Sequence, residues 1–148
     1  MKAWRLLDTG VRSAAENIAL DQVLFDSRIA DEIPNTLRFM QFSPPAVLVG
    51  HHQVVVQEAR VDWCRDHGVD VNRRLTGGGA IYFDSTQIGW ELVGATTDFE
   101  GIDMTGLTRT VCEAAATGLR ELGVAAEFRP RNDIEVDGRK ISGTGGVA

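Results

Sequence analysis

The residues from Arg73 to Asp84 are of types that can bind an anion, with two arginines, a threonine and three consecutive glycines. Glycines lack a Cβ, so the backbone can adopt positive φ and let a ligand approach closely, and amides freed in such a turn can converge on an anion. Arg73 and Arg74 add forked donors suited to phosphate or carboxylate. The flanks 69–71 and 80–83 predict strands. We expect a strand–glycine loop–strand that binds an anion, and the alternative is a tight hairpin with a flexible tip.

A second polar group surrounds a lysine late in the sequence. Asn132 and Asp133 precede a short apolar run, Asp137-Gly138 is a strong hairpin turn signal, and Lys140 follows the turn. Strand pairing across that turn would bring these polar groups near each other. A lone strand lysine is usually a solvated edge residue. Because the chain has only one other lysine among its 15 basic residues, this setting favours a lysine that belongs to a site.

Two long helices and several short strands must position these residues. Ser13 and Glu16 match a capping box and predict a helix to about residue 30, and a second helix is expected from residue 103 or 105 to Gly123. Strands are expected at 4–7, 36–42, 46–50, 88–93, 125–128, 134–136 and 139–143, and a short helix at 57–67. This mixture predicts one α+β domain over residues 1–148, with helices packed on one face of a mainly antiparallel sheet.

The remaining polar and sulfur-containing residues receive structural interpretations. Asn17 and Asp21 share the polar stripe of the first helix, which we expect to face solvent. His51 and His52 have no third ligand at metal spacing, so no metal site is predicted there. Cys64 and Cys112 lie on predicted helices, where a small packing role is favoured over a nucleophile.

The composition is ordinary for a soluble globular chain. The sequence has 148 residues, of which 43% are hydrophobic and 24% charged. A formal net charge of -6 disfavours nonspecific binding to nucleic acid. Two cysteines do not make a disulfide framework, no signal peptide is visible, and no apolar run reaches the length of a membrane span. We therefore expect a cytoplasmic protein that binds neither nucleic acid nor membrane.

Three blocks of the sequence resemble the lipoate–protein ligase family. They are Arg73–Ala80, Arg131–Ile134 and Gly138–Thr144, and the resemblance covers nearly the whole chain from the helix at 15–21 onward. Each block is weak alone, whereas all three in this order are specific. The resemblance implies a biotin/lipoate-ligase-like α+β fold.

The resemblance also implies an activity. Family members activate lipoate with ATP to lipoyl-AMP and pass the acyl group to a lysine of a lipoyl carrier domain, such as an E2 domain or an H protein. By resemblance, Lys140 is the catalytic residue at the carboxylate and phosphate region, Asn132 helps to bind the nucleotide, and Asp133 lies where Mg²⁺ and phosphate are held. The other implied substrate- or nucleotide-binding residues are Arg73, Arg74, Thr76, Gly77, Gly78, Gly79, Ala80, Ser142, Gly143 and Thr144.

Two features depart from the family pattern. Phe83 stands where many members have a histidine before the aspartate that corresponds to Asp84, and this bears on activity or acyl specificity. Family catalytic domains continue with further strands beyond the point at which this chain stops. We therefore expect an incomplete sheet with an exposed edge, which a second polypeptide completes to give a heterodimer.

Two other functions compete with the ligase. An octanoyltransferase or lipoyltransferase of the same fold passes the acyl group through a cysteine thioester and needs no ATP, so a thiol should lie near the lysine motif. No cysteine occurs between Glu127 and Thr144, which favours the ligase. A non-catalytic subunit that binds lipoate or a carrier is the third possibility, and biotin ligase is a weaker one because its glycine and lysine blocks differ.

Overall fold

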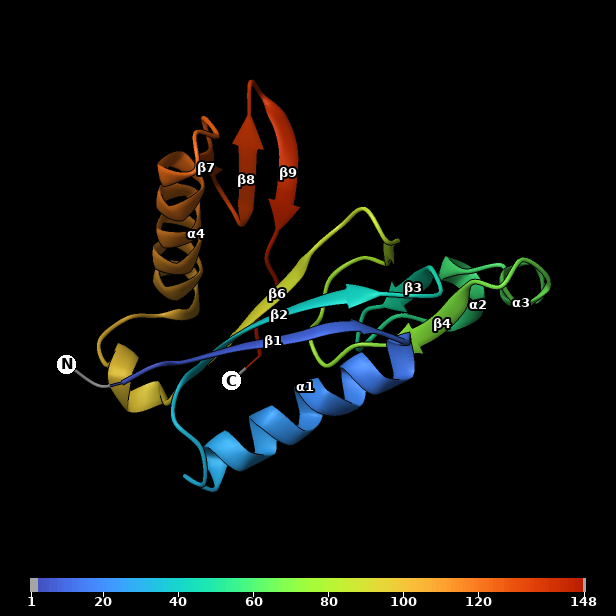
Figure 1. The fold of residues 1–148 in the computed structure, drawn as a ribbon, viewed down its shortest axis with the longest axis horizontal. Coiled ribbons are helices and arrows are strands. Elements are labelled where there is room, and N and C mark those ends of the chain that lie inside the picture. Colours follow the sequence, from blue (N-terminus) through green and yellow to red (C-terminus); the bar gives the residue numbers. More distant parts are fainter. Residues whose placement is uncertain (1–2, 148) are drawn as a thin grey trace. The chain divides into compact units, whose positions relative to one another are not determined.

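The computed structural model describes residues 3–147 and divides between Asp98 and Phe99 into two compact units (Figure 1). The first unit contains β1 (Arg5–Arg12), α1 (Ala14–Ile29), β2 (Thr36–Phe42), β3 (Ala46–Val49), α2 (Val55–Glu58), α3 (Val61–Asp66), β4 (Asp70–Arg73), β5 (Ile81–Phe83) and β6 (Gly89–Val93). The 3₁₀ helix η1 (Thr96–Phe99) lies at the boundary. The second unit contains α4 (Met104–Glu121), β7 (Glu127–Arg129), β8 (Asp133–Val136) and β9 (Arg139–Gly143).

Both long helices begin at the caps that the sequence predicts. The Ser13 side chain accepts from the N–H of Glu16, and the Glu16 carboxylate accepts from the N–H of Ser13, which completes the capping box. At α4, the Asp103 side chain accepts from the N–H of Gly106. These bonds satisfy N–H groups that have no partner within the first helical turn. The predicted helix starts are therefore confirmed.

The described strands form three small sheets. The first unit holds the sheets β1-β2-β6 and β4-β3-β5, and the second holds β7-β8-β9. Four strand pairs are antiparallel, while β1–β2 and β3–β4 are parallel. The predicted α+β class is confirmed, with mixed sheets where a mainly antiparallel one was expected. Parallel neighbours require a crossover connection, and α1 supplies it between β1 and β2.

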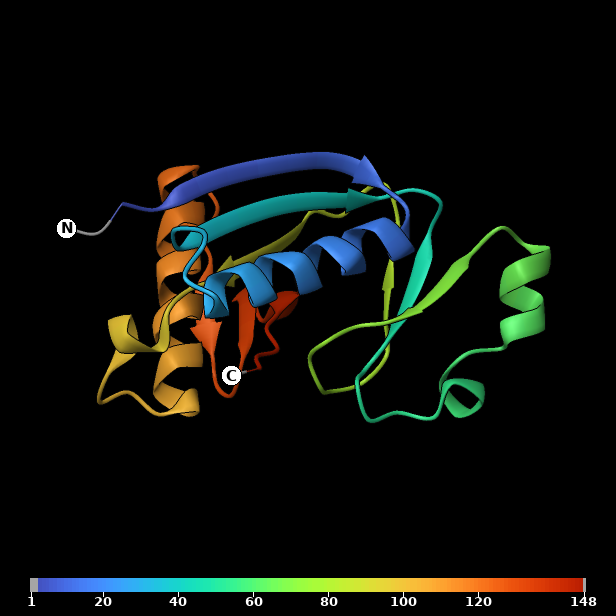
Figure 2. The same ribbon diagram turned by 90° about the horizontal axis from the view of Figure 1, so that it is seen from below.

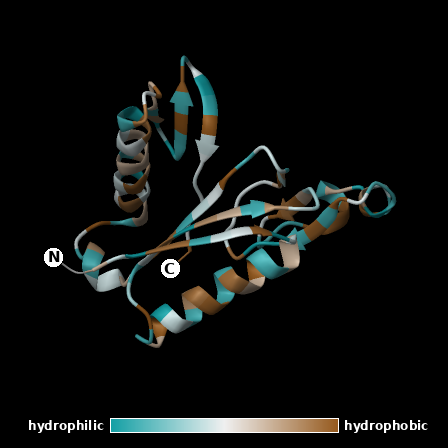
Figure 3. Cartoon of the chain, in the orientation of Figure 1, coloured by the Kyte–Doolittle hydropathy of each residue, from teal (hydrophilic) through white to brown (hydrophobic). Residues whose placement is uncertain are grey.

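The helix α1 covers one face of the first sheet. It contacts β2, β4 and β6, and it runs beside β1 and β2 in both views (Figures 1 and 2). The residues of β2 that face it are buried, and they are Thr36, Arg38, Met40 and Phe42. Figure 3 shows hydrophobic segments interleaved with hydrophilic ones along α1, so the helix brings polar as well as apolar groups to the sheet.

The core of the first unit connects its two sheets. Ala14 of α1 packs with Met40 and Phe42 of β2 and with two residues of β3, Ala46 and Leu48. Phe83 packs against this cluster, and its ring stacks on Phe42 with centroids 4.7 Å apart. Phe83, the residue at which the sequence departs from the pattern expected by resemblance, therefore packs against the core.

The strand expected at 4–7 extends to Arg12 as β1, and the helix expected at 57–67 is also wrong in extent. The single helix expected at 57–67 is two short helices, α2 and α3, separated at Ala59 and Arg60. Ala59 has extended backbone angles (φ -135°, ψ 137°), and neither helix has a side-chain N-cap bond. The predicted end at Gly68 is confirmed, because its φ of 66° is the left-handed conformation that closes a helix.

In the second unit, α4 packs against β7 and β8. Its buried cluster contains Cys112 and Ala116 of α4, Ala126, and Ile134 of β8. The predicted turn at Asp137-Gly138 connects β8 to β9, and both of its residues have positive φ. This is the backbone geometry that a two-residue hairpin turn requires, so the hairpin that carries Lys140 is confirmed.

Candidate functional site

The glycine loop lies between β4 and β5 but is not a hairpin tip. β3 pairs with β4 on one side and with β5 on the other, so the two strands that flank the loop are not neighbours. The loop must therefore pass over the end of β3, near Val49 and Gly50. The hairpin alternative is wrong, and anion binding by the loop stays a prediction.

Arg74 is tied to the loop itself. Its guanidinium donates to the carbonyls of Gly77 and Gly79 at 2.8 and 2.7 Å and to that of Leu48 at 2.8 Å. Its Nε also donates to the Thr76 hydroxyl at 3.1 Å. Partial burial lowers the pKa of Arg74, although an arginine stays protonated in a protein. The sequence predicted ligand contacts for these donors, whereas the structure uses them to hold backbone.

Arg73 holds the segment that follows β3. Its Nη1 lies 2.9 Å from the Gly50 carbonyl, 2.7 Å from that of His51 and 2.8 Å from that of Gln53. The His51 N–H in turn donates to the Thr76 carbonyl at 3.0 Å. The two histidines thus lie beside the glycine loop, and their exposed rings touch edge to face, with centroids 4.7 Å apart.

The lysine hairpin brings a positive and a negative side chain together. Lys140 Nζ lies 2.7 Å from Asp133 Oδ1, and the two side chains are 55% and 27% exposed. This oxygen is buried without a directed hydrogen bond, so the contact is an ion pair. The lysine reaches it by crossing Gly143, where an added Cβ would lie 2.8 Å from both Cε and Nζ.

Asn132 and Thr144 close the open end of the same hairpin. The Asn132 side chain donates to the Thr144 carbonyl at 2.6 Å, and the Thr144 N–H donates to the Asn132 carbonyl at 2.9 Å. Ser142 pairs with Ile134 across the hairpin. These bonds fix the ends of the two strands that carry Asp133 and Lys140.

A thiol lies close to the lysine hairpin, which the sequence argument did not expect. Cys112 of α4 donates from Sγ to the Thr144 hydroxyl at 3.3 Å. The residue is 0% exposed and belongs to the core of the second unit. The lysine motif has no cysteine near it in the sequence, but the fold brings Cys112 close to it. The predicted packing role of Cys112 agrees with its burial.

Comparison with known proteins identifies the family. The model of the lipoyl protein ligase A/B catalytic domain matches residues 13–147. The chain belongs to this family. The resemblance drawn from the three sequence blocks is confirmed, and so is the fold that it implied.

The curated relatives of this family member include transferases and ligases. The octanoyltransferase LipM of Moorella thermoacetica is 35% identical over 131 residues, which are 86% of this chain and 46% of that protein. The lipoate-protein ligase LplJ of Bacillus subtilis is 36% identical over 99 residues, which are 67% of this chain and 29% of that protein. The chain spans about half the length of the first curated relatives that it matches.

Solved ligase structures share the fold. A bi-partite lipoate protein ligase from Thermoplasma acidophilum, studied with its E2 lipoyl domain, matches with a TM-score of 0.82 and 28% identity, over 100% of this chain and 57% of that chain. A lipoate-protein ligase A bound with ATP matches with a TM-score of 0.75 and 27% identity, over 100% of this chain and 62% of that chain. The family therefore contains an ATP-bound member of this fold.

The predicted magnesium ligand, Asp133, lies in the lysine hairpin. Mg²⁺ binds through one or two carboxylates together with phosphate oxygens and water. In residues 3–147, no group of three or more His, Cys, Asp or Glu side chains could hold a metal. Asp133 supplies one carboxylate, whose Oδ1 is paired with Lys140, and its role in holding Mg²⁺ stays a prediction.

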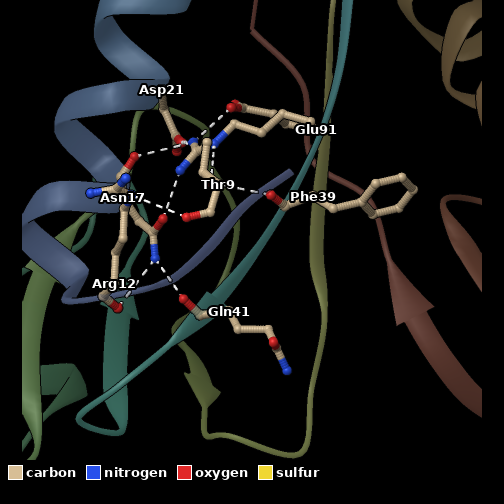
Figure 4. Close-up of polar contacts among 8 residues, drawn as sticks. Thr9, Arg12, Asn17, Asp21, Phe39, Gln41 and Glu91 are labelled. Atoms are coloured by element: carbon tan, nitrogen blue, oxygen red, sulfur yellow. Dashed lines mark hydrogen bonds and ion pairs between the residues drawn. The ribbon is translucent and has the colours of Figure 1, made fainter. Parts of the chain in front are cut away.

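A buried charged cluster was missed by the sequence analysis. Arg38 of β2 is 0% exposed, and its Nη1 lies 2.6 Å from Asp21 Oδ1 and 2.8 Å from Glu91 Oε1. Its Nη2 donates to the Asn17 side chain at 2.6 Å, and its Nε donates to Thr9 at 2.9 Å. Figure 4 shows Asn17 and Asp21 directed from α1 toward this cluster.

The expectation that Asn17 and Asp21 face solvent is therefore wrong. Asn17 is fully buried, and its amide also donates to the Gln41 carbonyl at 2.9 Å (Figure 4). A buried guanidinium needs compensating charges and acceptors, and the polar stripe of α1 supplies them. An arginine at the third position of an alternating strand, together with a helix that carries Asn and Asp four residues apart, is the signal that could have revealed the cluster.

The cluster predicts a pH-dependent stability. Burial and the negative charge of Glu91 raise the pKa of Asp21 from 3.8 to about 7, against the opposing effect of Arg38. The folded chain therefore binds this proton more tightly than the unfolded chain, and the contribution of Asp21 to the free energy of unfolding falls between pH 4 and pH 7. Between pH 4 and pH 7, the free energy of unfolding of the wild type, measured relative to that of Asp21→Asn, should fall by about 1.4 kcal/mol or more. This amount corresponds to one pKa unit.

Urea unfolding at pH 4 and pH 7.5 measures this difference. Asp62→Asn is the matched control, because the Asp62 side chain is 86% exposed, and its stability difference from wild type should not change with pH. A difference between wild type and Asp21→Asn that is the same at both pH values would contradict the prediction.

Proposed function

We propose that this chain carries residues of an enzyme that activates lipoate with ATP and joins the lipoyl group to a lysine of a carrier domain. Membership of the lipoyl protein ligase family supports the acyl substrate, and the fold shared with an ATP-bound ligase supports the nucleotide. The chain spans about half the length of its curated relatives. We therefore propose that its residues take part in this reaction.

The proposed reaction has two steps. In the first, a carboxylate oxygen of lipoate attacks the α-phosphorus of ATP, a C–O–P anhydride forms, and pyrophosphate leaves. In the second, the neutral amine of the carrier lysine attacks the acyl carbon, AMP leaves with the bonding electron pair, and the nitrogen loses a proton. The first step brings two negatively charged groups together, and the second develops negative charge on the acyl oxygen and on the departing AMP, so a fixed positive charge lowers both barriers.

Lys140 is the residue to which we assign that charge. Its side chain is 55% exposed, although Asp133 and Gly143 fix its position. An ammonium group held in one place needs little reorganisation when charge develops on a carboxylate or a phosphate. In this proposal Asp133 orients Lys140, while Asn132 and Thr144 hold the hairpin in register.

The burial of both cysteines favours adenylation over a thioester mechanism. Cys64 is 4% exposed and Cys112 is 0% exposed, and these are the two cysteines of the sequence. A thioester mechanism needs a thiolate that reaches the acyl donor. Neither thiol of this chain can do so in the described structure.

Octanoyl transfer is the second candidate function. The first curated relatives that the chain matches are octanoyltransferases, and Cys112 lies within hydrogen-bonding distance of Thr144 at the end of the lysine hairpin. If the second unit opened, Cys112 would be the thiol nearest to that motif. In this mechanism the thiolate would attack the acyl carbon of a thioester donor and release the donor's thiol, and the carrier lysine would then attack the enzyme thioester and release the cysteine.

Pyrophosphate exchange distinguishes the two functions. The ligase should exchange labelled pyrophosphate into ATP only when lipoate or octanoate is present, because the adenylate step is reversible. A transferase gives no exchange but becomes acylated on cysteine by an octanoyl-carrier donor. Cys112→Ala, with Cys64→Ala as its matched control, should leave exchange unchanged. An absence of exchange together with Cys112-dependent acylation would replace the ligase by the transferase.

The partners follow from the same proposal. The proposed acceptor is a lipoyl domain of the kind named with the Thermoplasma ligase, and because that ligase is described as bi-partite, a second polypeptide is proposed as a further partner. Native mass spectrometry with lipoate and ATP would detect both partners. A stable monomer with full ligase activity would contradict the proposed second chain.

A further inference from the structure

The carbonyl groups of the glycine loop all face one side. The Thr76 carbonyl accepts from the His51 N–H, and the carbonyls of Gly77 and Gly79 accept from Arg74. The Gly78 carbonyl lies against Gly50 so closely that a Cβ on Gly50 would collide with it. Four successive carbonyls are thus directed toward a frame that consists of Arg74 and the segment from Leu48 to His51.

The direction of the carbonyls fixes the direction of the N–H groups. In a trans peptide the C=O and N–H bonds point in opposite directions, and the described cis peptides lie elsewhere, at Ser43-Pro44 and Pro130-Arg131. The N–H groups from Gly77 to Ala80 are therefore directed away from the frame. Within residues 3–147, those of the three glycines donate to no protein acceptor, and Gly78 and Gly79 are exposed.

We propose that Arg74 is a positioning residue that orients the N–H groups of the glycine loop toward an oxyanion and does not itself contact that anion. The proposal rests on the proposed function, which supplies the anion as the carboxylate of the acyl substrate or a phosphate of the nucleotide. Outward N–H groups of successive residues can converge on either anion.

The guanidinium group is what makes this arrangement possible. Arg74 reaches Leu48 at the end of β3 through one terminal nitrogen and the carbonyls of Gly77 and Gly79 through the other. A planar fork can hold acceptors in these separate directions, whereas an ammonium group is a single point of charge. A positioning role therefore predicts that lysine cannot replace Arg74, while a direct charge contact predicts that lysine can.

Amide NMR with two anions tests the proposal in the wild-type protein. Octanoate and inorganic phosphate are titrated separately, which distinguishes an acyl carboxylate from a nucleotide phosphate as the source of the anion. With at least one anion, the N–H resonances of Gly78 and Ala80 should shift more than the Nε–H of Arg74. A larger shift at Arg74, or no shift of the loop amides with either anion, would overturn the proposal.

Three variants provide the second measurement. Arg74→Lys and Arg74→Gln should each weaken binding of the anion at least tenfold and increase the motion of the glycine amides. Arg65→Gln, in which the altered side chain is 69% exposed on α3, should bind within twofold of wild type. If Arg74→Lys binds the anion within twofold of wild type, the positioning role is overturned. If either Arg74 variant does not fold, the titration of the wild-type protein decides the question. If an anion shifts the loop amides but the protein shows no pyrophosphate exchange, the proposed ligase function is refuted and this inference still holds.

Discussion

Replacing Lys140 with alanine is expected to slow adenylate formation about 10²- to 10³-fold, the usual cost of removing one group that stabilises developing charge. The substitution removes the ammonium group that we place beside the reacting carboxylate and phosphate. It should have little effect on stability, because a partly exposed ion pair contributes about 1 kcal/mol or less. Lipoate-dependent pyrophosphate exchange measures the activity, and thermal unfolding measures the stability.

Two neighbouring substitutions sharpen the Lys140 prediction. Gly143→Ala places a Cβ 2.8 Å from the lysine Cε and Nζ, and a flexible side-chain end can move away from it. The variant should fold normally but lose exchange activity, since Nζ is displaced from Asp133. Arg139→Ala is the matched control, because Arg139 is an exposed charge next to the lysine on β9. Full activity in Gly143→Ala would show that the observed position of Lys140 is not required.

Replacing Arg38 with methionine is expected to destabilise the first unit by about 3–5 kcal/mol, the typical result of removing one partner from a buried ion pair. Asp21 and Glu91, 17% and 20% exposed, would lose the guanidinium that lies between them. The Asn17 side chain would also lose its donor. A loss of this size approaches the total stability of a small domain.

Tryptophan fluorescence during urea unfolding measures the loss where it occurs. The chain has three tryptophans, Trp4, Trp63 and Trp90, and all three precede the boundary at Asp98. Arg65→Met is the matched control, because its ion pairs with Asp62 and Asp66 are exposed, and it should change stability by no more than about 1 kcal/mol. Equal losses in the two variants would refute the buried role of Arg38.

A triple substitution that removes all three charges distinguishes the effect of unpaired charge from the effect of lost packing. Combining Arg38→Met with Asp21→Leu and Glu91→Met removes all three charges and replaces them with apolar groups of similar volume. Such replacements of buried ion clusters are often neutral or stabilising. Recovery of most of the lost stability would show that the unpaired carboxylates, and not a cavity, destabilise Arg38→Met.

The sequence predicted those features that depend on residues close to one another in the chain. The Ser13–Glu16 capping box spans one helical turn, and the Asp137-Gly138 turn joins strands that are adjacent in sequence. Such signals act over a few residues, so they work without knowledge of the rest of the fold. Each of the three family blocks is likewise a contiguous run of residues, and the fold that they implied was confirmed.

The placement of the functional groups required long-range contacts. The alternation in β2 is compatible with either face being buried, and a shift by one residue exchanges the two faces. In the structure Arg38 is buried and Phe39 is 36% exposed, because Asn17 and Asp21 of α1 stabilise the guanidinium. The pairing of β3 with both β4 and β5 likewise decides that the glycine loop is not a hairpin.

The sequence by itself determined the family, the α+β class, the two long helices and the hairpin that carries Lys140. The tertiary structure alone decided that Arg73 and Arg74 hold backbone carbonyls, that Lys140 crosses Gly143 to reach Asp133, and that Cys112 lies beside Thr144. The physical reason is that residue type limits which bonds a side chain can form. Which of those bonds form depends on acceptors that only the folded chain brings within reach.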